Sequence, residues 1–371
     1  MKTVSEVASW TEDYVNFLAS FTDAPPVYSR FMAWAVLGAA LSGQCAPISI
    51  AADDLRPNFW VILVGPSGEA RKSTELKVCR RMARKADDRL PAPQGGSFVG
   101  VLEHLQKNPN ILFVFDEFKR FMAWMAEDYN REAKSFFTEI YDWPYDEDWI
   151  AARAAGRGSY AGQTNSIRIK GPAVSMCIGS TAEWLTGAVG RSDLVSGFLP
   201  RFLLIPYPGK EKTFSYPPER CKNWENRLTQ ALRAAKKVRF RYKVTSGARE
   251  GFQKWYDQVK VNDVFEQSPI LRPYFHRMTV YAWKICMVEA VSQVITKPGG
   301  LSDSWGMEGQ VMEQEVTIDE SMMKLATEAL SETLEPLADL FEDSMAKGRF
   351  QEQQRDVIEA LKAVKKKQRV H

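Results

Sequence analysis

The residues best suited to chemistry follow an apolar stretch that ends in a turn. Residues 59–64 are apolar, and a segment containing Gly, Pro and Ser leads from them to Lys72, Ser73 and Thr74. A strand, a short loop and a helix start would direct backbone N–H groups and the positive end of the helix toward an anion. Lys72 would then reach the β- and γ-phosphates of ATP, and the Ser73 hydroxyl would hold Mg²⁺. The residues predicted to surround the phosphates are Gly65, Pro66, Ser67, Gly68, Arg71, Lys72, Ser73 and Thr74.

This phosphate-binding loop, or P-loop, departs from the usual pattern G-x-x-x-x-G-K-[ST] at two points. The interval from Gly65 to Lys72 is one residue longer, and Arg71 stands where a glycine would precede the lysine. A side chain at this position would crowd the phosphates, although its positive charge would compensate. The alternative is that a Lys-Ser-Thr sequence follows a strand by chance.

A second apolar stretch, residues 111–115, ends in the adjacent carboxylates Asp116 and Glu117. Unbroken apolarity is typical of a strand buried on both faces of a parallel sheet. Asp116 would hold Mg²⁺ through water, and Glu117 would orient and deprotonate the water that attacks the γ-phosphate. The alternative is a solvated Asp-Glu pair at the end of a strand.

Two further strands carry polar residues that suit the same site. Residues 173–178 are apolar except for Ser175 and lead to Ser180 and Thr181, whose hydroxyls would contact the γ-phosphate or the attacking water. Serine and threonine are also ordinary turn residues. Arg201 comes just before apolar residues 202–205 and would act on the nucleotide of a neighbouring subunit as an arginine finger. A surface arginine at a strand entrance is the alternative.

This series of motifs resembles the AAA+ ATPases, and among them the branch that contains the superfamily III viral helicases and the minichromosome-maintenance helicases. It is more closely similar to a family of phage, plasmid and mobile-element ATPases that are fused to, or encoded beside, primase-polymerases. The similarity rests on Pro57-Asn-Phe-Trp60, on the Arg-Lys-Ser-Thr variant of the P-loop and on Ser196-Gly-Phe-Leu-Pro-Arg-Phe202, and it covers about residues 10–300.

The resemblance implies an α/β fold with a P-loop NTPase (AAA+-like) parallel-sheet core and a mainly helical lid, assembled into a homo-oligomeric ring such as a hexamer. We expect an N-terminal helical segment over residues 1–56, the ATPase core over 57–208 and a mainly helical domain over 209–371. The exception is residues 238–244, whose alternating pattern predicts a strand. Arg272 or Arg277, at the start of an apolar helix, would be a second phosphate sensor or simply part of a solvated helix end.

The insertion over residues 149–170 is basic and contains several glycines. The related helicases place a basic hairpin here that points into the ring channel. Mobile cations suit the phosphates of DNA, and aromatic or Arg faces suit single-stranded bases. The predicted DNA-binding residues are Arg153, Arg157, Tyr160, Arg168 and Lys170. The alternative is a solvated loop, in which case the basic strand 238–244 or the C-terminal tail offers other cations.

The composition limits the other classes of function. The net charge is only +3, so any nucleic-acid contact has to come from local patches. The 5 cysteines and 3 histidines show no metal-like spacing, and scattered cysteines suit a reducing cytosol. Because neither a signal peptide nor an apolar run of membrane-spanning length is visible, we expect no membrane role and a cytoplasmic protein, bacterial or encoded by a phage or mobile element.

The sequence therefore predicts a Mg²⁺- and ATP-dependent DNA translocase or helicase for the replication of a phage or mobile element. Its partners would be single-stranded or forked DNA and a separate primase-polymerase. Two alternatives stay open: an AAA+ ATPase that remodels or loads proteins without unwinding DNA, and a nucleotide-binding switch with a degenerate P-loop.

Overall fold

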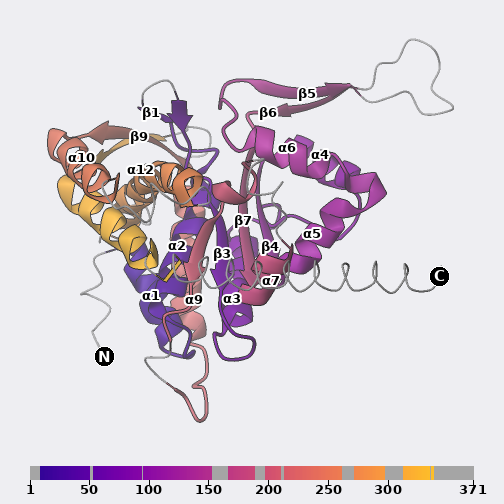
Figure 1. Ribbon diagram of the computed structural model, residues 1–371. Coiled ribbons are helices and arrows are strands. Elements are labelled where there is room, and N and C mark those ends of the chain that lie inside the picture. The colour runs from indigo at the N-terminus through magenta and orange to yellow at the C-terminus, as the bar shows by residue number, and fades with distance from the viewer. Residues whose placement is uncertain are drawn as a thin grey trace, which may run out of the picture.

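Four parallel strands form the central sheet, in the order β4-β7-β3-β8 (Figure 1). The computed structural model describes residues 9–50, 53–93, 95–152, 166–188, 197–209, 213–260, 271–296, 312–334 and 336–337. The strands are β3 (Trp60–Val64), β4 (Asn110–Phe115), β7 (Ala173–Ser180) and β8 (Leu203–Pro206). They coincide with the four apolar stretches of the sequence, so the predicted α/β class is confirmed. The inner strands β3 and β7 are buried along their whole length, as parallel strands usually are.

The pairing register brings all four strands to an end at the same side of the sheet. Trp60 of β3 lies opposite Met176 of β7, and Val61 lies opposite Leu203 of β8. We call the side where the strands end the carboxyl end of the sheet and the opposite side the amino end. Loops and helix starts that follow the strands therefore gather at the carboxyl end.

Helices cover both faces of the sheet. Because residues two apart in a strand point to the same face, Phe113 and Phe115 of β4 share one face of the sheet. There they contact Phe137 of α6 (Ala133–Ile140) and Phe121 of α5 (Phe118–Ala126). α2 (Pro26–Leu41) and α3 (Lys72–Ala86) pack on the same strands and on each other. Nearly every residue of α2 is buried, in agreement with its apolar sequence on all sides.

Further helices surround this core. α1 (Trp10–Ala19) and α2 occupy the positions where the sequence predicts helices, and α1 packs against α9 (Lys222–Ala235) and α12 (Leu271–Ile295). α10 (Ser246–Lys260) and a helix over residues 320–334 lie farther along the chain.

Among the described helices, none combines the length and apolarity that crossing a membrane would require. The remaining helices of the described residues are α4 (Phe98–Lys107), α7 (Ala182–Ala188) and the 3₁₀ turns η2 (Asp128–Asn130) and η3 (Leu199–Arg201).

Among its described residues, the C-terminal part contains a strand that the sequence does not predict. β9 (Val238–Val244) is the predicted alternating strand, and its partner is β10 (Met312–Ile318), which lies where the sequence predicts a helical region. That expectation is wrong for residues 312–318. Glu and Gln at positions 313–315 weaken the strand pattern in the sequence, whereas the structure shows the segment paired in parallel with β9.

Two small antiparallel ribbons complete the described chain. β1 (Ile48–Ile50) pairs with β2 (Asp53–Leu55), so the end of the segment 1–56, which the sequence predicts to be helical, is an antiparallel ribbon instead. β5 (Asp148–Ala152) pairs with β6 (Ser166–Lys170). The β5–β6 ribbon immediately precedes β7, so it lies at the amino end of the sheet, where Figure 1 shows it above the helices α4 and α6.

Two tyrosine hydroxyls fasten α12 to the amino end of the sheet. The Tyr281 hydroxyl accepts a hydrogen bond from the backbone N–H of Trp60 (3.0 Å) and donates one to the carbonyl oxygen of Arg201 (2.6 Å). The Tyr274 hydroxyl accepts from the backbone N–H of Leu204 at 2.9 Å. Because both rings are buried, these bonds satisfy backbone groups that water cannot reach.

We expect Tyr281→Phe to lower the free energy of unfolding by about 1–3 kcal/mol, the usual cost of leaving buried polar groups without a partner. Tyr14→Phe is the matched control, because the Tyr14 ring is also fully buried and its hydroxyl makes no hydrogen bond in the described structure. Urea unfolding measures both. Equal losses in the two variants would show that the Tyr281 bonds contribute nothing specific.

Candidate nucleotide site

The loop between β3 and α3 turns sharply at the carboxyl end of the sheet. The N–H of Gly65 donates to the carbonyl oxygen of Ser180 at 3.1 Å, which fixes the start of the loop beside β7. A Cβ at position 65 would lie 2.8 Å from both the Tyr28 hydroxyl oxygen and Cβ of Tyr207, so only glycine fits. Gly68 has a φ of 75°, which glycine adopts without strain. We refer to residues 65–71 as the 65–71 loop.

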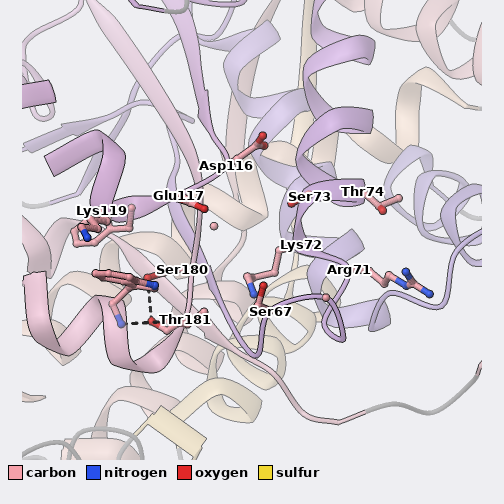
Figure 2. Close-up of a pocket in the computed structure, with 14 residues that line it drawn as sticks. Ser67, Arg71, Lys72, Ser73, Thr74, Asp116, Glu117, Lys119, Ser180 and Thr181 are labelled. Carbon is pink, nitrogen blue, oxygen red and sulfur yellow. Dashed lines mark hydrogen bonds between the residues drawn. The ribbon is translucent and has the colours of Figure 1, made fainter. Parts of the chain in front are cut away.

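Arg71, the last residue of this loop, has the left-handed backbone conformation (φ 52°, ψ 22°). It is the single non-glycine residue with positive φ in the described parts of the chain. Its Nε lies 2.6 Å from Oδ1 of Asp23, a carboxylate whose side chain is only 3% exposed. Figure 2 shows the Arg71 side chain directed away from Lys72. The extra cation of the loop is thus held by a carboxylate, and its backbone keeps the conformation that a glycine would take.

Lys72 opens α3, and its ammonium group stays beside the loop. Nζ donates to the carbonyl oxygens of Gly65 (2.5 Å) and Pro66 (2.9 Å). Burial lowers the pKa of Lys72, and the charge of Glu183 opposes that shift. The amine is therefore next to the backbone turn that precedes the helix.

A buried carboxylate anchors the first turn of α3, a feature that sequence reasoning missed. Glu75 is completely buried, and its Oε1 accepts a hydrogen bond from the Ser29 hydroxyl of α2 at 2.6 Å. Burial raises the pKa of Glu75 to about 8, although the Ser29 bond opposes the rise. Its sequence context, Ser-Thr-Glu-Leu, resembles an ordinary solvated helix start and gives no sign of this burial.

The carboxylates Asp116 and Glu117 follow β4 at the same end of the sheet, and both are exposed. Glu117 is the residue that precedes the first turn of α5. The strand ends β4 and β7 approach closely here, because a Cβ on Gly179 would lie 2.6 Å from the Asp116 carbonyl oxygen. This glycine therefore keeps Asp116 near Ser180 and Thr181.

The two hydroxyls at the end of β7 already have local partners. The Ser180 hydroxyl donates to the Thr181 carbonyl oxygen at 3.0 Å. The Thr181 hydroxyl accepts from the backbone N–H of Trp184 at 3.3 Å, which caps the first turn of α7.

These elements enclose one cavity of about 420 Å³, a volume typical of small-molecule sites (Figure 2). The structure brings together ten of the predicted residues from three separate stretches of sequence. The cavity is lined by Ser67, Gly68, Arg71, Lys72, Ser73, Thr74, Asp116, Glu117, Phe118, Lys119, Gly179, Ser180, Thr181 and Trp184. Of the predicted loop residues, Gly65 and Pro66 do not line it. Lys119 and Trp184 were not predicted, because a lysine at a helix start and a lone tryptophan have no distinctive sequence pattern.

Arg201 is not among the lining residues and lies at the amino end of the sheet, directly before β8. Its Nη1 donates to the Gly197 carbonyl oxygen (2.6 Å), and its Nη2 donates to Oδ2 of Asp142 (3.4 Å). Arg277 of α12 donates to the same oxygen at 3.0 Å. The two arginines thus share one carboxylate, while Arg272 is exposed in the first turn of α12.

The predicted DNA-binding residues fall partly within the described chain. Arg168 and Lys170 are exposed on β6, on the side of the strand opposite to buried Ile167 and Ile169. Arg168 pairs with Asp148 of β5 at 3.3 Å. Arg153, Arg157 and Tyr160 lie outside the described residues.

No protein-family model matches the chain, and no curated protein matches it significantly in sequence. The geometry of the cavity is therefore the basis on which a function can be proposed.

Proposed function

We propose that this chain is an Mg²⁺-dependent ATPase of the AAA+ type that acts as a DNA translocase or helicase in the replication of a phage or mobile element. The observation that carries the proposal is the cavity at the carboxyl end of the sheet. A loop with a lysine at a helix start, an Asp-Glu pair and a pair of hydroxyls line one cavity, although they come from three distant stretches of sequence.

The residues of the cavity fit a nucleotide triphosphate with its metal ion. Lys72 and the N-terminus of α3 offer positive charge to the phosphates. The Ser73 hydroxyl and the Asp116 carboxylate line the same cavity, and oxygen atoms of these types are the ligands that Mg²⁺ prefers. Bound there, Mg²⁺ would neutralise negative charge on the phosphates as they react.

Glu117 is the residue best placed to accept a proton from the attacking water. It is exposed at the cavity, directly after Asp116 and before the first turn of α5. Water would attack the γ-phosphorus in line with the bond to the β-phosphate oxygen, which breaks to leave ADP. Ser180 and Thr181 would orient this water or the γ-phosphate.

Two substitutions separate binding from hydrolysis. Lys72→Ala should weaken ATP binding and abolish turnover, because the phosphates lose the cation at the helix start. Glu117→Gln should retain ATP binding and slow hydrolysis by at least about a hundredfold, the usual contribution of a positioned base. Fluorescent-nucleotide binding and phosphate release measure the two effects. Full turnover in Lys72→Ala would remove the basis of the proposal, and binding without hydrolysis by the unaltered protein would favour the nucleotide-switch alternative.

The location of Arg201 supports an oligomer in which neighbours complete one another's sites. Arg201 and the cavity lie at opposite ends of the same parallel sheet, so Arg201 cannot reach the cavity of its own chain. A head-to-tail ring would bring the amino end of one sheet to the cavity of the next. Arg201 would then stabilise charge on the transferred phosphoryl group.

A mixing experiment tests this arrangement. Arg201→Ala alone should bind ATP normally and lose roughly a thousandfold in turnover. Mixed with Lys72→Ala, it should regain activity, because some interfaces pair an intact Lys72 with an intact Arg201. Thermal unfolding of each variant checks that the fold survives without the hydrogen bonds to Gly197 and Asp142. A mixture that stays inactive at every ratio would argue against a shared site.

We propose that the protein translocates along DNA and that its partner is a separate primase-polymerase. The support for DNA binding is the β5–β6 ribbon, which presents Arg168 and Lys170 on an exposed face at the amino end of the sheet. Proteins that bind single strands use such cations against the phosphates.

Arg168→Ala with Lys170→Ala should weaken single-stranded DNA binding and reduce its log–log salt slope by about 0.7 for each phosphate that the protein no longer neutralises. ATPase activity without DNA should persist, whereas stimulation by DNA and unwinding of a forked duplex should fall. Arg239→Ala with Lys243→Ala is the matched control, since both are exposed cations on β9. If only the control pair reduces DNA affinity, β9 is the binding surface; an ATPase that ignores DNA altogether would favour the protein-remodelling or loader alternative.

A further inference from the structure

Lys119 is a second lysine in the cavity, on the side of the Asp-Glu pair. It is the second residue of α5, two positions after Glu117, and it is exposed among the lining residues. Figure 2 shows Lys119 and Arg71 on opposite sides of Lys72. Lys72 and Lys119 therefore approach the cavity from different strands, Lys72 after β3 and Lys119 after β4.

An indole ring holds the Lys119 ammonium at the cavity. Nζ lies 3.8 Å from the centre of the Trp184 ring, and Trp184 itself lines the cavity and is 47% exposed. Trp184 is fixed in the first turn of α7 by the Thr181 cap. A cation over an aromatic face is attracted by the ring quadrupole. This contact holds the amine but leaves its positive charge in place. A carboxylate partner would neutralise that charge.

The cations around the cavity differ in whether a carboxylate neutralises them. Arg71 also lines the cavity, but its guanidinium is paired with Asp23. In the described parts of the chain, none of the salt bridges involves Lys119. Lys119 is thus a cation that forms no salt bridge among the described residues, and it lies two residues after Glu117 in the lining of the same cavity. The terminal phosphate of a nucleotide held by Lys72 would lie on this side of the cavity.

We propose that Lys119 is a further catalytic residue, which contacts the terminal phosphate of ATP from within the same subunit, and that Trp184 is its positioning residue. This inference rests on the proposed ATPase function. In the reaction, a bond forms between the water oxygen and the γ-phosphorus, the bond to the bridging oxygen breaks, and Glu117 takes the water proton. Lys119 keeps its proton and stabilises the charge on the oxygens of the transferred group.

Steady-state turnover and the affinities for ATP and ADP test the proposal. Lys119→Gln should lower turnover by about a hundredfold, the usual effect of removing one donor to the transition state. ADP affinity should stay within about twofold, because ADP lacks the phosphate that Lys119 contacts. Lys119→Arg should restore much of the turnover, since it keeps the charge. Lys77→Gln is the matched control, as Lys77 is an exposed lysine of α3 outside the cavity.

Trp184 provides the second arm of the experiment. Trp184→Leu should lower turnover severalfold at unchanged ADP affinity, and Trp184→Phe should retain most activity because it keeps an aromatic face. Thermal unfolding distinguishes a structural contact between α5 and α7: equal losses in Lys119→Gln and Lys119→Arg, together with a lower unfolding temperature, would overturn the proposal.

The failure of this inference is separable from the failure of the proposed function. If the unaltered protein hydrolyses ATP and Lys119→Gln does so within about twofold of it, Lys119 is not catalytic and the ATPase proposal stands. An unaltered protein that neither binds nor hydrolyses ATP would overturn both.

Discussion

The parallel alignment of four strands is the constraint on which the rest of the structure depends. Because all four strands end on one side, the 65–71 loop, the Asp-Glu pair and the Ser180-Thr181 pair meet there although they are far apart in the sequence. The same alignment sends Arg201, the shared carboxylate of Asp142 and the β5–β6 ribbon to the other side. The five residues of β3 span roughly 17 Å at about 3.3 Å per residue. A site that uses both ends therefore requires two copies of the chain.

Buried polar contacts hold the two ends of the sheet in place. At the carboxyl end, the Tyr28 hydroxyl donates to the Val64 carbonyl oxygen at 2.7 Å, directly before the 65–71 loop. At the amino end, the buried guanidinium of Arg56 donates to the carbonyl oxygens of Gly171 (2.9 Å) and Pro172 (3.0 Å) in the turn that leads into β7. Lys284 is also buried there, with Nζ 2.8 Å from Oδ1 of Asn58, and burial lowers its pKa to about 7. Such groups are costly unless they are paired, so they fix the turns in one arrangement.

The sequence predicts those features that depend on local pattern. Unbroken apolar runs identified the four central strands, and polar residues after each run indicated where a site would form. The features that the sequence did not predict depend on partners that are distant along the chain. β10 is a strand only beside β9, Glu75 is buried only because α2 covers it, and Lys119 acquires its position from Trp184. The side-chain partners of Arg201 could not be predicted either, since Asp142 comes from a different part of the chain.

Arg71 connects a loop that lines the cavity with the segment between the N-terminal helices α1 and α2. A glycine before the lysine would adopt positive φ freely. For an arginine, the left-handed backbone conformation costs roughly 1–2 kcal/mol. Here the guanidinium reaches Asp23, which lies between α1 and α2 and is almost fully buried. Tyr28 and Ser29, in the first turns of α2, contact the end of β3 and the start of α3. Residues 23–29 thus make three contacts with the loop and with the strand and helix on either side of it. Arg71 therefore combines a backbone conformation that glycine adopts without strain with an ion pair to the segment that precedes the sheet, so the loop and that segment are directly connected.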